Sequence, residues 1–232
     1  MWGRNVPPTA GLPPLPQGPR FSRVELRHIA IAFSVLTFDL WLIFDGVSPY
    51  TAGSLFGHGL SPSTTVSLLL GVPVAALAAG TGFLAHEMGH KFAAQHLGLW
   101  AEFRAFWNGL IISLLFSALG FLFAAPGATY IAGRGDREEN GLTSLAGPAV
   151  NLLEAAVLVG GGLALERVGA LFVASVLLLV GSINVYWAAF NLIPFGPLDG
   201  AKVLRWKAPV WAAVFAGAVA WGVALFLFTG FL

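Results

Sequence analysis

Long apolar segments are the feature that most limits what this chain can fold into. Of its 232 residues, 57% are hydrophobic and 10% are charged, which is unlike a soluble globular domain. A helix needs about 20 apolar residues to cross the hydrocarbon core of a membrane. Six segments approach that length: 29–44, 65–90, 108–125, 142–165, 168–193 and 209–231. The sequence therefore predicts an all-α polytopic membrane protein with about six membrane segments, for which the lipid bilayer is one partner.

The first residues have a different composition. Residues 1–27 are rich in Pro and Gly and bury too little apolar surface to fold alone, so they predict a flexible tail. Residues 28–232 form the predicted membrane-embedded domain. No basic helix or Gly-rich phosphate loop indicates a nucleic acid or nucleotide partner.

Positive charges predict the orientation of the chain, because Lys and Arg are retained in cytoplasmic loops. All of the 12 Lys and Arg residues except Arg167 fall on one side if the amino terminus is cytoplasmic and the carboxyl terminus lies outside. We therefore expect a multi-pass protein of the cell membrane in this orientation. The same assignment requires residues 98–141 to leave the cytoplasmic face and return to it.

His86-Glu87-Met88-Gly89-His90 is an H-E-x-x-H pattern at the end of an apolar segment. On a helix, His86 and His90 share a face and can converge on one Zn²⁺, while Glu87 lies one step round and can serve as a general base. The chain has no Cys, so any metal is held by His, Asp or Glu. The plain alternative is a charged helix end outside the membrane whose histidines are paired by chance.

Such a zinc site needs a third protein ligand and an open fourth position. The candidates are His96, Asp39, Glu154 and Asp199. The helical period turns His96 away from the first two histidines. Asp39 and Glu154 lie within predicted spans, where a carboxylate is costly and therefore a candidate for function, and their roles stay open.

Asp199 has the most favourable context of the four. It lies in the sequence NLIPFGPLDG at 191–200, where Pro194 and Pro197 interrupt the helix and the glycines allow tight turns. The unwound backbone can aim Asp199 at the metal. The alternative is a helix-ending loop with a capping Asp.

The route of the chain near 108–125 has two interpretations. Residues 109–127 can enter the membrane and return through AAPGATYI at 124–131, as a re-entrant segment with a short β-like hairpin. Non-helical backbone at that depth must be satisfied by protein or a water-filled cavity, which would place it beside the metal site. Its open edge could then hold an extended substrate by strand addition. The second interpretation is a pair of ordinary short helices without a substrate role.

These motifs together resemble those of the site-2 proteases, which are intramembrane zinc metalloproteases. The resemblance rests on H-E-x-x-H at 86–90 and N-x-x-P-x-x-P-x-D-G at 191–200, with Gly-Pro-Ala-Val-Asn at 147–151 between them, and it covers roughly residues 65–205. The apolar insertion at about 104–124 is wider than in the simplest members, which leaves the route of substrate entry open.

The resemblance implies that His86, His90 and Asp199 bind one zinc ion, that Glu87 is the catalytic base and that Asn191 holds substrate. The implied reaction is hydrolysis of a peptide bond in or near a transmembrane segment of a substrate protein. Two alternatives are a membrane metal transporter and an inactive, protease-like protein that binds substrate. The sequence specifies neither the substrate nor the oligomeric state.

Overall fold

A computed structural model describes residues 21–44, 64–122, 126–133 and 136–229. Most of the predicted tail, residues 1–20, lies outside this part of the chain. The first helix begins at Arg23, which is earlier than the predicted boundary at residue 28.

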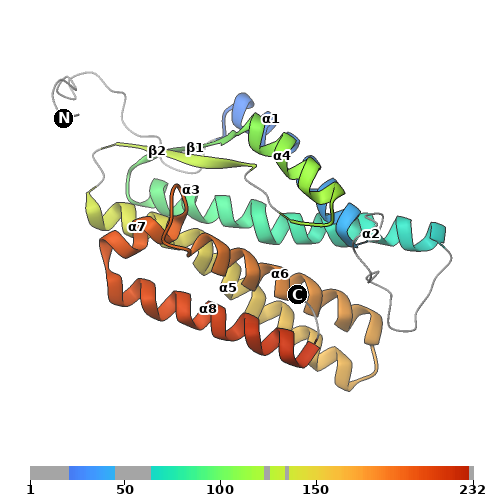
Figure 1. Cartoon of the computed structure of the whole chain (residues 1–232). Coiled ribbons are helices and arrows are strands. Elements are labelled where there is room, and N and C mark those ends of the chain that lie inside the picture. The colour runs from blue at the N-terminus through green and yellow to red at the C-terminus, as the bar shows by residue number, and fades with distance from the viewer. Residues whose placement is uncertain (1–20, 45–63, 123–125, 134–135, 230–232) are drawn as a thin grey trace.

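The described chain is mainly helical and contains one small sheet (Figure 1). Its elements are α1 (Arg23–Phe44), α2 (Thr64–Ala79), η1 (Gly80–Ala85), α3 (His86–His96), β1 (Trp100–Ala105), α4 (Trp107–Ala118), β2 (Gly127–Ala132), α5 (Arg137–Arg167), α6 (Leu171–Asn191), α7 (Asp199–Trp206) and α8 (Ala208–Thr229). The segments α2, η1 and α3 follow one another without a break, and η1 is a turn of wider π-helix.

Four of the described helices are long and apolar enough to cross a membrane: Arg23–Phe44, Arg137–Arg167, Leu171–Asn191 and Ala208–Phe228. They make the chain a membrane protein, but they do not confirm the six expected segments. The predicted segment at 108–125 contains α4, which has 12 residues. At 1.5 Å per residue, this helix is about 18 Å long and cannot cross a core of about 30 Å.

The sheet shows how the chain returns beside the point from which it left. Strands β1 and β2 are antiparallel and pair from Trp100 with Ala132 to Ala105 with Gly127. Helix α4 therefore leaves from one end of the sheet, and the chain comes back to the same end. The extended segment expected within 124–131 is confirmed as β2, and the alternative of two short helices is wrong. Its partner β1 was not expected, and it makes the fold not purely helical.

The helices form layers (Figure 1). Helices α5, α6 and α8 lie side by side, with α6 contacting both of the others. The continuous helix α2–η1–α3 lies against α5 and α6 and separates them from the sheet, α1 and α4. Apolar side chains pack between this helix and the sheet, where the rings of Phe83 and Phe103 meet edge to face with their centroids 5.5 Å apart. The same helix thereby contacts both layers and carries the H-E-x-x-H residues between them.

A buried ion pair fixes the sheet to this central helix. The Lys91 ammonium lies 2.6 Å from Glu25 Oε1, and both side chains are fully buried. Lys91 also donates to the carbonyl of Ala101, and the Phe103 N–H donates to Glu25 Oε1 at 2.9 Å. These bonds satisfy both buried charges. They also join α1, α3 and β1 directly next to His90.

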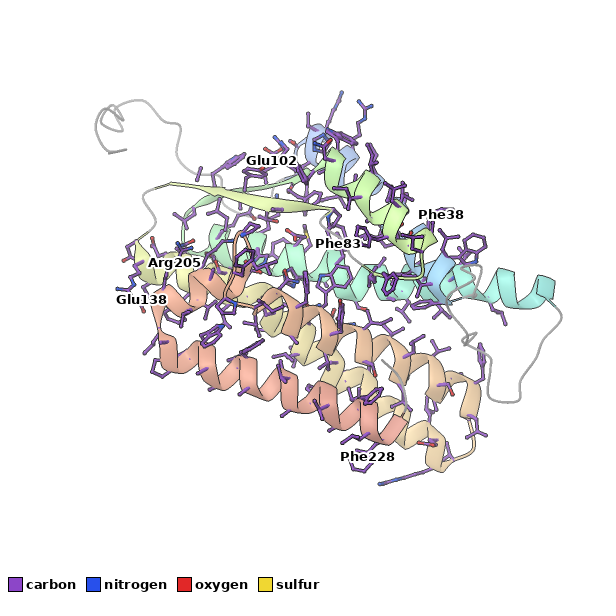
Figure 2. The ribbon with its side chains drawn as sticks, viewed as in Figure 1. Phe38, Phe83, Glu102, Glu138, Arg205 and Phe228 are labelled. Atoms are coloured by element: carbon purple, nitrogen blue, oxygen red, sulfur yellow. The ribbon has the colours of Figure 1, made fainter. Side chains whose placement is uncertain are left out.

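The two ends of the bundle differ in polarity. Figure 2 shows Glu138 and Arg205 at the end where α5 begins and α7 ends, and Phe228 at the opposite end, on α8. Phe228 is 88% exposed, as expected for a side chain that faces lipid. Helix α5 begins at the polar end with a capping box in which Asp136 and Glu139 each accept a bond from the other's backbone N–H.

Candidate metal centre

Three side chains from two distant parts of the chain meet inside the bundle. His86 Nε2 and His90 Nε2 are 3.0 Å apart, and Asp199 Oδ2 lies 3.4 Å from the first and 3.0 Å from the second. All three residues are buried, with exposed fractions of 2%, 7% and 6%. The structure thus brings together the three ligands suggested by the sequence motifs, and they form a group that could hold a metal ion.

The two histidines converge because they lie one helical turn apart at the start of α3. The π-helical turn η1 comes immediately before them, and such a turn is wound more widely than an α-helix. The Asn151 side-chain amide donates to two backbone carbonyls of η1, Gly82 at 3.0 Å and Thr81 at 3.3 Å. A side chain of α5 thus stabilises the irregular turn that leads into the site.

The outer nitrogens of both imidazoles have fixed partners. His86 Nδ1 lies 2.6 Å from Asn151 Oδ1, and His90 Nδ1 lies 2.7 Å from the carbonyl oxygen of Thr143. Asn151 uses its NH₂ group toward the η1 carbonyls and Asn184 Oδ1, so the atom it presents to His86 is its acceptor oxygen. Both Nδ1 atoms must therefore be donors, and both Nε2 atoms carry lone pairs.

The donor set fits a cation. Two Nε2 lone pairs and a carboxylate oxygen face one another in a buried space, an arrangement that is repulsive without a positive charge between them. Two His and one Asp, with partners that orient the imidazoles, match the three protein ligands of a catalytic zinc site. The chemistry of these residues therefore fits zinc.

Asp199 reaches the site because the chain unwinds between α6 and α7. Asp199 is the first residue of α7 and comes directly after residues 192–198, which include Pro194 and Pro197. A Cβ on Gly200 would overlap the carbonyl of Leu192, so only glycine lets α7 begin this close to the end of α6. The second carboxylate oxygen, Oδ1, lies 3.2 Å from Lys202 Nζ.

Gly147 leaves the space in which the imidazoles meet. It lies on α5, facing α3, and a Cβ there would come within 2.7 Å of His86 Nε2 and 2.6 Å of His90 Cε1, and nearer still to His90 Nε2. The glycine of the Gly-Pro-Ala-Val-Asn element therefore keeps the metal position open, and the asparagine four residues later orients His86.

Glu87 lies beside the metal group without belonging to it. Its side chain is buried, and its Oε2 accepts a hydrogen bond from Thr129 Oγ1 on β2 at 2.8 Å. The carboxylate is thus held between the H-E-x-x-H helix and the sheet. This is the position expected for a proton acceptor next to a metal rather than for a ligand.

The other candidates lie outside the metal group. His96 is the last residue of α3. Asp39 is fully buried in α1 and accepts a hydrogen bond from Ser117 on α4 at 2.8 Å, which ties these two helices together. Glu154 is partly buried on α5. The Asn191 amide donates to the carbonyl of Trp187 at 3.0 Å, so its role toward substrate stays a prediction.

A polar pocket of about 770 Å³ adjoins the site at the end of the bundle where α5 begins and α7 ends. The pocket is lined by the end of β2, by the start of α5 and by helix α7. Its lining residues include Gly133, Asn140, Thr143, Lys202 and Arg205. Thr143 bonds His90 and Lys202 pairs with Asp199, so the pocket wall is also the back of the metal group. A polar space therefore lies one residue away from two members of the metal group, His90 and Asp199, at this end of the bundle.

Sequence reasoning did not assign roles to three residues that support this site: Asn151, Thr143 and Thr129. Asn151 was visible as part of the Gly-Pro-Ala-Val-Asn element, although its bond to His86 was not. Thr129 lies in the segment expected to be extended. Thr143 acts through its backbone carbonyl, which leaves no signal in residue type.

Comparison with known proteins finds relatives that are named as zinc metalloproteases. The chain is 38% identical over 147 residues to "Putative zinc metalloprotease MJ0611" of Methanocaldococcus jannaschii, and the match covers 61% of this chain and 74% of that protein. It is 28% identical over 182 residues to "Putative zinc metalloprotease Rip3" of Mycobacterium tuberculosis, covering 76% of this chain and 40% of Rip3. No family model matches the chain, and no solved structure matches it.

The match to the archaeal protein combines 38% identity with nearly three quarters of that protein's length. The chain therefore belongs to the same family as the Methanocaldococcus jannaschii protein MJ0611, which is named as a zinc metalloprotease.

Proposed function

We propose that the chain is an intramembrane zinc metalloprotease of the site-2 type, which hydrolyses a peptide bond in or near a transmembrane segment of a substrate protein. The observation that carries this proposal is the convergence of His86, His90 and Asp199 within a bundle of apolar helices, with Glu87 beside them. The names of both relatives agree with a zinc protease. One zinc ion, held by these three residues, is the proposed cofactor.

The residues around the site have different roles in the proposed hydrolysis. Zinc, when bound, supplies Lewis acidity toward a carbonyl and lowers the pKa of water. Glu87 is the general base: its carboxylate takes a proton from the attacking water and passes it to the leaving amine. Asn151 and Thr143 hold His86 and His90 in the tautomer that leaves Nε2 free for the metal.

The open edge of β2 is the proposed place for substrate. In the two-stranded sheet, β1 covers one edge of β2, and no other described strand pairs with it. A substrate segment in extended form could add to this edge through main-chain hydrogen bonds. A helix must first unwind, because its carbonyls are otherwise engaged in bonds to residue i+4. Residues that break helices in the substrate should therefore favour cleavage. Asn191 is a further candidate for holding substrate.

The proposed orientation places the amino terminus in the cytoplasm and the carboxyl terminus outside. It is supported by the cluster of cationic residues at the end of the bundle where α7 lies: Arg137, Lys202, Arg205 and Lys207. Arg167 lies at the other end of α5. The polar pocket opens at the cationic end, so water for the reaction comes from the cytoplasmic side.

The test is cleavage of a model single-span substrate by the purified chain in detergent, with the wild type beside a Glu87→Gln variant and zinc quantified in both. We expect cleavage by the wild type only, and equal zinc in both proteins, because Glu87 is not a metal ligand. Zinc-loaded wild type that cleaves none of several substrates would refute the proposed activity and favour a protein that only binds substrate. Zinc transport into vesicles without any cleavage would favour a transporter.

A further inference from the structure

We propose that Thr129 is the positioning residue of Glu87 and couples the orientation of this base to the strand that receives substrate. This inference rests on the proposed protease function, and it assigns a role to a residue that lies outside the metal-binding motifs. It follows from three observations: the contact itself, the anchoring of the strand and the alternation of side chains along it.

The contact is between a hydroxyl and the carboxylate of the base. Thr129 Oγ1 lies 2.8 Å from Glu87 Oε2 and 3.2 Å from the backbone carbonyl oxygen of Glu87. A hydroxyl has one hydrogen to donate, and an ionised carboxylate accepts the stronger bond. Glu87 is only 8% exposed, so this bond replaces contacts with water that would otherwise orient the group. The hydroxyl therefore determines how the Glu87 carboxylate is turned.

The sheet holds this hydroxyl in place. Thr129 is β-branched, so few rotamers are open to it once its backbone is fixed in a strand. Its partner in the register is Phe103, whose backbone N–H donates to the buried Glu25 carboxylate, and that carboxylate pairs with Lys91 on α3. The strand bearing Thr129 is thereby anchored to the helix that bears Glu87, through contacts separate from the Thr129 bond.

Side chains alternate along β2 so that Thr129 points toward α3. Its neighbours Ala128 and Tyr130 are exposed, Tyr130 by 60%, whereas Thr129 is partly buried against Glu87. A substrate strand that pairs with the open edge of β2 would bond to the backbone beside Thr129 and restrict its movement. Substrate pairing would therefore also fix the hydroxyl that orients the base.

Loss of the hydroxyl should slow the chemical step more than it weakens binding. We expect Thr129→Val, which keeps the shape of the side chain, to lower kcat by about 10- to 100-fold, the range for groups that orient active residues. The KM should change by less than about threefold, because the backbone edge that binds substrate remains. Thr129→Ser keeps the hydroxyl and should recover most of kcat.

The experiment measures kcat, KM and bound zinc for both variants with the same single-span substrate. Tyr130→Phe is the matched control, since it removes a hydroxyl from the same strand on the face turned away from Glu87, and it should behave as wild type. Unchanged kcat in Thr129→Val would overturn the inference. An equal loss in Thr129→Ser, or a loss of zinc in Thr129→Val, would also overturn it, because each would indicate a role in packing.

The protease function and the role of Thr129 are tested by different variants. If the wild type cleaves and Glu87→Gln does not, the protease function stands whatever the Thr129 variants do. If the wild type does not cleave, the proposed function fails and the inference about Thr129 fails with it.

Discussion

Replacing Gly147 with Ala should abolish tight zinc binding. The new Cβ would lie 2.7 Å from His86 Nε2 and 2.6 Å from His90 Cε1, whereas ordinary contact begins at 3.4 Å. Both rings would have to retreat by about 0.7 Å, while bonds to zinc tolerate about 0.2 Å. Indirect perturbation of a ligand lowers metal affinity by about 10- to 100-fold. Because this change displaces two ligands directly, we expect a loss of at least ~100-fold, or about 2.7 kcal/mol.

Gly160→Ala is the matched control, since it lies on the same helix and a Cβ there meets nothing within 4 Å. Ala is favoured over Gly in helices by roughly 0.5–1 kcal/mol, so this variant should fold at least as well as the wild type and bind zinc equally. The assay is competition for zinc with a chromogenic chelator, using protein purified in detergent, with circular dichroism as a check on folding. Wild-type zinc affinity in a folded Gly147→Ala variant would refute the packing argument.

Three further predictions concern the groups around the site. Asn151→Leu removes the acceptor of His86 Nδ1 and should lower zinc affinity by about 10- to 100-fold in the same competition assay; unchanged affinity would show that His86 needs no such partner. Lys91→Met leaves the buried Glu25 without its counter-charge and should destabilise the fold by about 3–5 kcal/mol, measured by thermal unfolding, whereas Glu25→Gln together with Lys91→Met should lose less; equal losses would contradict this. Lowering the pH from about 7 to about 5 should release zinc, because only neutral imidazoles bind it, and affinity that stays constant over this range would argue against His86 and His90 as ligands.

The candidate site was more accessible to sequence reasoning than the fold around it. His86 and His90 are one helical turn apart, so their convergence follows from local geometry. Asp199 is over a hundred residues away, and its place was inferred from the Pro and Gly residues that interrupt the helix before it and from the resemblance to site-2 proteases. The structure brings all three together.

The features that sequence reasoning missed depend on contacts between distant residues. Strand β1 is six residues long, and its identity depends on pairing with β2 across the intervening helix α4. The bond of Thr129 to Glu87 and the pair of Lys91 with Glu25 join residues more than 40 positions apart. The expectation of six membrane segments counted apolar residues, whereas α4 is apolar but too short to cross.

The central claim is that this site cuts a peptide bond within the membrane. Its most direct test is mass spectrometry of the fragments produced when the chain and a single-span substrate are reconstituted together in lipid vesicles. The account predicts fragments that end inside the substrate's transmembrane segment with the wild type and none with Glu87→Gln. Fragments that end only in the substrate's soluble regions, or identical fragments from the variant, would contradict it.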